Sequence, residues 1–247
     1  MTAHLWQSLL PATNLMRAII LIGINFVRSQ WVAAAVMCAY VIGIGSIYRL
    51  HTQSEEILFF LRWNAAYAVL FATMIAMPVL QTERKSRRIL AVLSKGIYRW
   101  QYMSGVLCGC AIISAMFCLL VGGTAAWLGQ QSGIATNGLG GIVLALFFCC
   151  VASASTALFF AAFLHPLLAM AATSVVLALP MALDQVGIKT AWALYPLGAL
   201  FRALWIFQFQ PVSGLGTIML SAVFQALIFL IAACAVFARR DVTISPE

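Results

Sequence analysis

Few side chains in this chain of 247 residues are of the kinds that carry out covalent chemistry. His4, His51 and His165 are scattered along the sequence, and the six acidic residues form no catalytic constellation. An enzyme needs nucleophiles, acids, bases or metal ligands that converge on one site. The pattern therefore argues against an active site within this chain.

The sequence also lacks a motif for binding ATP. A phosphate-binding loop of the GxxxxGK[ST] type places a glycine directly before its lysine. Lys85, Lys95 and Lys189 are the three lysines, and none of them follows a glycine. We therefore expect no cofactor in this chain, and any ATP hydrolysis in a separate polypeptide.

Seven cysteines fall inside apolar runs or at their edges, without a CxxC motif and without a histidine at ligand spacing. This placement predicts small buried hydrophobic side chains rather than disulfides or metal ligands. The cysteines are Cys38, Cys108, Cys110, Cys118, Cys149, Cys150 and Cys234.

The composition indicates which solvent surrounds the chain. Hydrophobic residues make up 64% of it and charged residues 8%, and the mean hydropathy is +1.03. Soluble domains carry roughly a quarter charged residues. The apolar residues form runs near the roughly 20 residues that a helix needs to cross a bilayer. The protein is therefore expected to lie in lipid. Its net charge of +8 does not indicate nucleic-acid binding, because the chain has no soluble surface that could display a basic patch.

We predict an all-α polytopic membrane protein, with residues 1–247 forming a single transmembrane domain. His165 and Pro166 interrupt the helical pattern and separate the fourth span from the fifth. The six spans are expected at 31–48, 58–80, 102–128, 139–164, 167–183 and 214–237.

Two further segments are too interrupted to cross the bilayer. In the N-terminal region 1–30, polar residues break the apolar stretch 14–28, which favours a helix lying along the membrane surface. Segment 184–213 is aromatic-rich and broken by glycine and proline, so we expect short helices that dip into the outer interface. Its aromatic side chains would lie at headgroup depth.

The positive charges orient this arrangement. With both termini in the cytoplasm, ten of the fourteen Lys and Arg residues lie inside and four, Arg49, Arg62, Lys189 and Arg202, lie outside. Cytoplasmic loops collect Lys and Arg, so this orientation is favoured. We expect a multi-pass protein of the bacterial cytoplasmic (inner) membrane.

The expected spans contain hardly any ionisable side chains. Ion-coupled carriers keep acidic or histidine residues at membrane depth, so the pattern disfavours secondary transport. It suits a path for a lipidic, amphipathic or peptide-like substrate. Ser153, Ser155 and Thr156 either face a partner helix or bond to their own helix backbone. Asp184 and Lys189 either pair at the outer face or remain separately solvated.

Stretch 83–102 is the most informative cytoplasmic segment. Charge fills its first turns, and apolar residues then recur at the spacing of one helical face, at Ile89, Leu90, Val92, Leu93 and Ile97. This pattern predicts an amphipathic helix on the membrane surface. Charge alone also admits a simpler interpretation, in which the loop is held at anionic headgroups by about 1 kcal/mol per Lys or Arg.

The same stretch resembles the coupling segment of type-2 ABC transporter permeases, the membrane domains of a family of exporters. That family has six spans, an N-terminal interfacial helix and a coupling helix after span two. Its segment has a Glu-Arg start, a Leu-rich helix, a short break and an aromatic stretch that leads into span three. The matching residues here are Glu83, Arg84, Leu90, Leu93, Ser94, Gly96, Arg99, Trp100, Gln101 and Gly105. The pattern departs from the family at Ser86, Arg87 and Val106.

The resemblance implies that Glu83 to Lys95, within the coupling segment 83–99, docks onto a cytoplasmic ATPase. The coupling residues would be Glu83, Arg84, Arg87, Arg88, Leu90, Leu93, Ser94 and Lys95. It also implies two copies of an ABC ATPase subunit, which bind ATP and magnesium, and a second permease protomer, identical or not.

Segment 184–213 resembles the outer re-entrant helices of that family. The residues expected to matter there are Trp192, Tyr195, Arg202 and Trp205. The function implied is that of the membrane-spanning subunit of an exporter. The alternative is a membrane scaffold or assembly factor that transports nothing.

Overall fold

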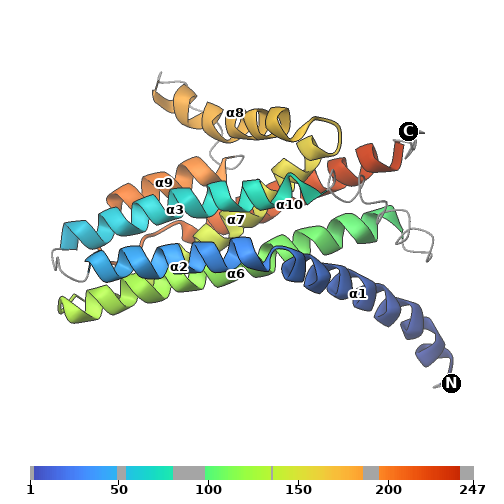
Figure 1. The fold of residues 1–247 in the computed structure, drawn as a ribbon, viewed down its shortest axis with the longest axis horizontal. Helices are drawn as coiled ribbons and strands as arrows, with labels where there is room; N and C mark the ends of the chain where they lie inside the picture. Colours follow the sequence, from blue (N-terminus) through green and yellow to red (C-terminus); the bar gives the residue numbers. More distant parts are fainter. Residues whose placement is uncertain (1–2, 49–53, 80–97, 135, 186–194, 240–247) are drawn as a thin grey trace.

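The structure is a computed structural model that describes residues 3–48, 54–79, 98–134, 136–185 and 195–239. Within these ranges the chain forms eight helices and no strand (Figure 1). They are α1 (Ala3–Ser29), α2 (Trp31–Tyr48), α3 (Ser54–Ala76), α6 (Arg99–Gln131), α7 (Leu139–Ala161), α8 (Pro166–Gln185), α9 (Pro196–Ile206) and α10 (Leu215–Arg239).

Five of the described helices are long and apolar enough to cross a bilayer: α2, α3, α6, α7 and α10. They agree with the predicted spans at 31–48, 58–80, 102–128, 139–164 and 214–237, with ends that differ by a few residues. The predicted span at 167–183 forms a helix, α8, whose described apolar part is Pro166–Leu179, so a sixth crossing stays a prediction. The structure therefore supports a multi-pass protein with five candidate spans.

Helix α7 lies at the centre of the bundle. It packs against α10, α3 and α6, and its second half carries an almost unbroken run of buried small residues from Ala152 to Ala157. Small side chains let neighbouring helices approach closely, which is the usual way helices associate in lipid. By contrast, α8 lies at the edge of the bundle, where Leu167, Leu168 and Val175 are exposed (Figure 1).

Helices α1 and α2 are nearly continuous. The Gln30 N–H donates to the Phe26 carbonyl at 3.1 Å, and the Ala34 N–H donates to the Gln30 carbonyl at 3.0 Å, so hydrogen bonds continue across the junction. The axis bends there, and α1 leans away from the bundle (Figure 1). A helix is thus present where the N-terminal region was expected to be helical, and its position at the membrane surface stays a prediction.

Helix α6 is long enough to pair with both α1 and α2. Its 33 residues extend roughly 50 Å, more than the hydrocarbon core of about 30 Å. At its start, the Tyr98 N–H donates to Oε1 of the buried Gln101 at 2.9 Å, which satisfies a backbone group at the helix terminus. The first half of α6 then packs on α1, and the second half packs on α2.

Glycines bring α1 and α6 unusually close. A Cβ added at Gly109 would lie 2.5 Å from a ring carbon of Phe26 and 2.9 Å from the carbonyl oxygen of Gly23. A Cβ at Gly105 would lie 2.7 Å from Cβ of Ile22. Only glycine fits at these two positions, which are four residues apart on one face of α6. The crossing holds α1 against the end of α6 that follows the charged segment 83–99.

Candidate functional site

Helix α9 is a short helix held in place by an arginine from α3. Pro196 occupies its first position, where a missing N–H costs no hydrogen bond. At its other end, Nε of Arg62 donates to the Leu204 carbonyl and an Nη of Arg62 donates to the Trp205 carbonyl, both at 3.1 Å. The guanidinium also lies 4.5 Å from the centre of the Trp205 ring. Arg62 therefore caps α9 and ties it to α3.

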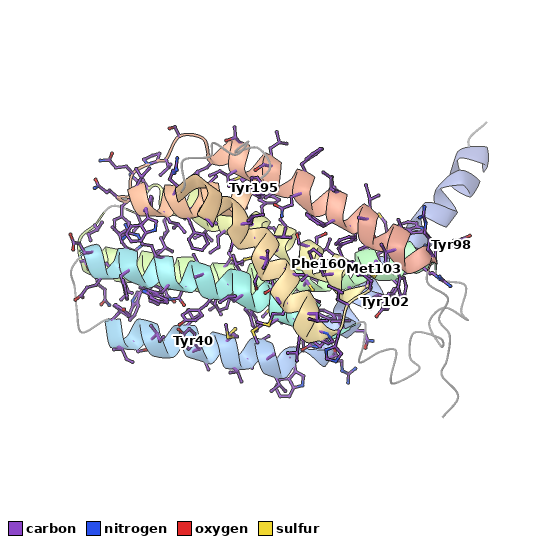
Figure 2. The ribbon with its side chains drawn as sticks, turned by 90° about the horizontal axis from the view of Figure 1, so that it is seen from above. Tyr40, Tyr98, Tyr102, Met103, Phe160 and Tyr195 are labelled. Atoms are coloured by element: carbon purple, nitrogen blue, oxygen red, sulfur yellow. The ribbon has the colours of Figure 1, made fainter. Side chains whose placement is uncertain are left out.

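A second arginine caps α10 at the opposite end of the bundle. An Nη of Arg99 donates to the Phe237 carbonyl at 3.0 Å, and Cζ of the same guanidinium lies 5.9 Å from the centre of the Phe237 ring. Tyr102 stacks on the same ring, with centroids 6.3 Å apart. Tyr98 and Tyr102 are both seen at this end in Figure 2. Arg99 thus links the start of α6 to the end of the last span.

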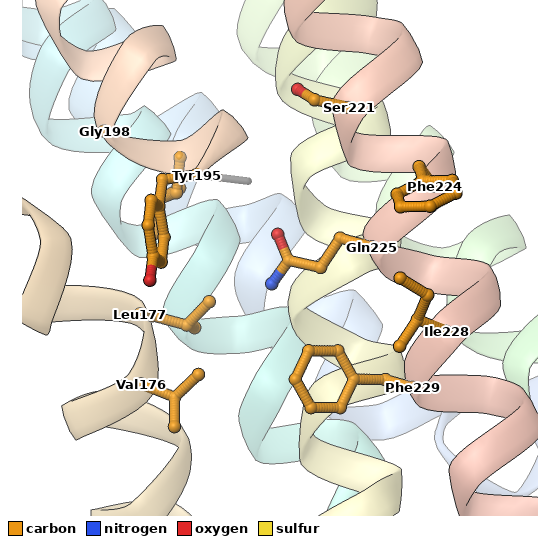
Figure 3. A pocket seen from close by; sticks show the side chains of 10 residues that line it. Val176, Leu177, Tyr195, Gly198, Ser221, Phe224, Gln225, Ile228 and Phe229 are labelled. Carbon is orange, nitrogen blue, oxygen red and sulfur yellow. The ribbon is translucent and has the colours of Figure 1, made fainter. Parts of the chain in front are cut away.

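A cavity lies between α8, α9 and α10 (Figure 3). Its volume is about 250 Å³, and most of its lining is apolar. Val176 and Leu177 contribute from α8, Leu197 and Gly198 from α9, and Phe224, Ile228 and Phe229 from α10. Three polar side chains, those of Tyr195, Ser221 and Gln225, also reach it.

Hydroxyl groups join α7 to α10 beside this cavity. Oγ of Ser155 donates to the Ala226 carbonyl at 2.7 Å, and Nε2 of Gln225 reaches Oγ1 of Thr156 at 3.4 Å. Ser153 and Thr156 donate to carbonyls of their own helix, those of Cys149 and Ala152. Both interpretations of these hydroxyls apply: Ser155 bonds to α10, Ser153 bonds to its own helix, and Thr156 donates to its own helix while accepting from Gln225 of α10.

A larger groove of about 820 Å³ runs between α9 and the first half of α10. One face of α9 lines it through Ala199, Arg202, Ala203 and Ile206. The facing wall is mainly apolar but includes the hydroxyls of Thr217 and Ser221. Ser221 and Phe224 border both this groove and the cavity of Figure 3. The two spaces therefore adjoin each other along α10.

Of the residues predicted for the outer segment, Tyr195, Arg202 and Trp205 lie in or beside α9. Tyr195 lines the cavity, Arg202 lines the groove, and the ring of Trp205 lies against the Arg62 guanidinium. Trp192 lies outside the described residues. The predicted coupling residues Glu83, Arg84, Arg87, Arg88, Leu90, Leu93, Ser94 and Lys95 also lie outside them, as does any pairing of Asp184 with Lys189.

No group of three or more His, Cys, Asp or Glu side chains that could hold a metal ion occurs within the described ranges. All seven cysteines have free thiols, and Cys110, Cys118, Cys149 and Cys150 are buried. The prediction of buried packing groups is confirmed for these four, whereas Cys38, Cys108 and Cys234 are half-buried.

Sequence reasoning missed the contributions of Arg62 and Gln225. Arg62 was expected to lie on the outer side, and no partner was predicted for it. Its partners, Leu204 and Trp205, come 142 and 143 positions later in the sequence, so no local pattern indicates the contact. Gln225 interrupts an otherwise apolar stretch of the last span, from Ala222 to Leu230. A lone amide in such a run was the signal that could have pointed to the cavity.

Comparison with models of protein families finds none that matches this chain. Comparison with curated proteins also finds no match. The function is therefore inferred from the residues and the geometry of this chain.

Proposed function

We propose that this chain is the membrane-spanning subunit of an ATP-binding-cassette exporter in the bacterial inner membrane. Two permease protomers enclose the substrate pathway, and two ATPase subunits on the cytoplasmic side bind ATP and magnesium. The permease performs no covalent chemistry. ATP binding biases the pathway between inward-open and outward-open forms, because the ATPases bind one form better than the other.

The observation that carries the proposal is the connection between segment 83–99 and the last span. The segment resembles a coupling helix and leads directly into α6, where Arg99 holds the Phe237 carbonyl of α10. Gly105 and Gly109 hold the same part of α6 against α1. A displacement of the segment would therefore act on three helices at once.

The placement of charge supports transport of an apolar or amphipathic substrate. Arg62 and Arg99 are both engaged with carbonyls at helix ends, and the described polar groups that face the cavity between α8, α9 and α10 are neutral. Proton- or ion-coupled carriers keep charged groups at membrane depth. A pathway driven by separate ATPases has no such requirement.

The test is purification of the tagged full-length chain from its native host in mild detergent. Copurifying proteins are identified by mass spectrometry and assayed for ATP hydrolysis. Wild type is expected to retain an ATPase with a phosphate-binding loop, and the double variant Leu93→Asp/Arg87→Glu is expected to lose it while still inserting into the membrane. The variant Arg239→Glu/Arg240→Glu reverses two charges on the side expected to be cytoplasmic and should retain the ATPase.

If wild type retains no ATPase, the exporter proposal fails and the scaffold interpretation is favoured. If both variants lose the ATPase, loss of positive charge elsewhere in the chain has the same effect as the change in the segment. The proposed specific docking of segment 83–99 is then wrong.

A further inference from the structure

The cavity of Figure 3 is large enough for part of an organic molecule. Its volume is about 250 Å³. A dry apolar cavity of roughly 150 Å³ is already sufficient to bind benzene. Leu177, Leu197 and Phe229 wall the cavity from three different helices, so a molecule within it would contact α8, α9 and α10 together.

Gln225 places a carboxamide against this space. The group has two donor hydrogens and an acceptor oxygen. Among the described residues, its side chain makes only the 3.4 Å contact of Nε2 with Oγ1 of Thr156, and that hydroxyl already donates to the Ala152 carbonyl at 2.9 Å. Hydrocarbon supplies no hydrogen-bonding partner, so an amide in this position gains free energy from a ligand that pairs with it.

Tyr195 brings a second polar group to the same space. It precedes α9, and its side chain lies across the cavity from Gln225, with the hydroxyl directed toward α8 (Figure 3). A phenol hydroxyl both donates and accepts. None of the described residues that line the cavity carries a formal charge. A charged head group would lose its hydration there without an opposite charge to replace it.

The neighbouring groove provides room for an apolar tail. Phe224 borders both spaces and is 56% exposed. Beyond it, Ala203, Leu220 and Leu227 line the apolar part of the groove of about 820 Å³, whose lining on the α9 side also includes Arg202. A molecule whose head lies in the cavity can therefore extend a hydrocarbon chain past Phe224 along α10.

We propose that the α8–α9–α10 cavity binds an uncharged amphipathic molecule whose head carries a hydroxyl or amide group. Gln225 and Tyr195 hydrogen-bond the head, and the tail lies in the adjoining groove. The site belongs to a single copy of the chain and does not depend on ATP-driven export.

The probe is a monoacylglycerol that carries a diazirine in its acyl chain, added to the full-length chain in phosphatidylcholine nanodiscs. After illumination, labelled peptides are mapped by mass spectrometry. We expect labelling in α8 and α10 that unlabelled monoacylglycerol suppresses. An alkyl phosphate with the same diazirine chain should label these peptides at least about fivefold less. Equal labelling by both probes would overturn the preference for an uncharged head, and an absence of competable labelling would overturn the site.

Variants identify the groups that bind the head. Gln225→Leu removes the amide at similar size and should weaken competable labelling roughly two- to tenfold, the usual effect of one lost hydrogen bond. Gln130→Leu makes the same change at an exposed position of α6 and should leave labelling unchanged. Tyr195→Phe removes only the hydroxyl and should weaken labelling in the same direction. If Gln225→Leu does not fold, unchanged labelling of Tyr195→Phe is the result that overturns the proposed head contacts.

Discussion

Arg62 and Trp205 lie 143 positions apart in the sequence, yet the guanidinium lies 4.5 Å from the centre of the indole ring and donates to the Trp205 carbonyl. The last carbonyls of a helix have no partner within that helix. Arg62 supplies one for α9, and Arg99 does the same for α10 at the other end of the bundle. Each of the two arginines thus donates hydrogen bonds to carbonyls at the end of a helix other than its own.

Replacing Arg62 by Ala should loosen α9 selectively. The loss of two hydrogen bonds and a ring contact should cost about 1–2 kcal/mol, so amide exchange in α9 should accelerate roughly 5- to 30-fold. Hydrogen exchange followed by mass spectrometry measures this directly. Arg17→Ala changes an exposed arginine of α1 and should leave α9 unaffected. An unchanged exchange rate in α9 of Arg62→Ala would show that the cap contributes no local stability.

Arg99→Ala should fray the last turn of α10. The Phe237 carbonyl loses its donor, and the ring loses the cation above it while keeping its stacking on Tyr102. We expect a loss of about 1–2 kcal/mol in unfolding free energy and faster tryptic cleavage after Arg239. The matched control is Arg239→Gln, which alters an exposed arginine on α10 itself, with stability measured by thermal unfolding in detergent. Equal melting temperatures for Arg99→Ala and wild type would contradict this role.

Two glycines of α6 should respond oppositely to the same substitution. Gly109→Ala forces a methyl group against Phe26 and Gly23, and should destabilise the protein by about 1–3 kcal/mol. Gly123→Ala places the methyl group where no atom lies within 4 Å, so it should be neutral or slightly stabilising. Unfolding in mixed detergent compares the two variants. Similar stabilities would mean that α1 does not pack on α6 as described.

Two serines of α7 allow a hydrogen bond between helices to be compared with a hydrogen bond inside one helix. Ser155→Ala removes the hydrogen bond to Ala226 of α10, which in membrane proteins is worth roughly 0.6 kcal/mol. Ser153→Ala removes only a bond to the carbonyl of its own helix, at Cys149. Ser155→Ala should therefore lower the unfolding free energy more than Ser153→Ala does. The reverse order would argue against direct α7–α10 pairing through Ser155.

The spans could largely be predicted from the sequence because apolar length is a local property. Predicted span 31–48 coincides with α2, and the break at His165 and Pro166 separates α7 from α8. Pro166 begins a helix well because it needs no hydrogen-bond partner for a backbone N–H at that position. The sixth span, 167–183, lies within α8 and stays a prediction, because the described apolar part of that helix is Pro166–Leu179.

The contacts between distant residues could not be predicted in the same way. No spacing rule connects Arg62 with Trp205 or Ser155 with Ala226, because such contacts depend on how whole helices pack. The glycines of α6 illustrate the same limit. Gly109 and Gly123 look alike in the sequence, and only their neighbours in space distinguish a position that requires glycine from one that does not.

The arginine cap of α9 also has a consequence for biosynthesis. A ribosome adds about 5–20 residues per second, so Trp205 emerges roughly 7–30 s after Arg62. During that interval α3 must enter the membrane with an arginine whose final partners do not yet exist. Water, lipid phosphates or the insertion machinery must solvate the guanidinium until α9 arrives, which makes the end of the bundle that holds α9 among the last parts to assume its final form.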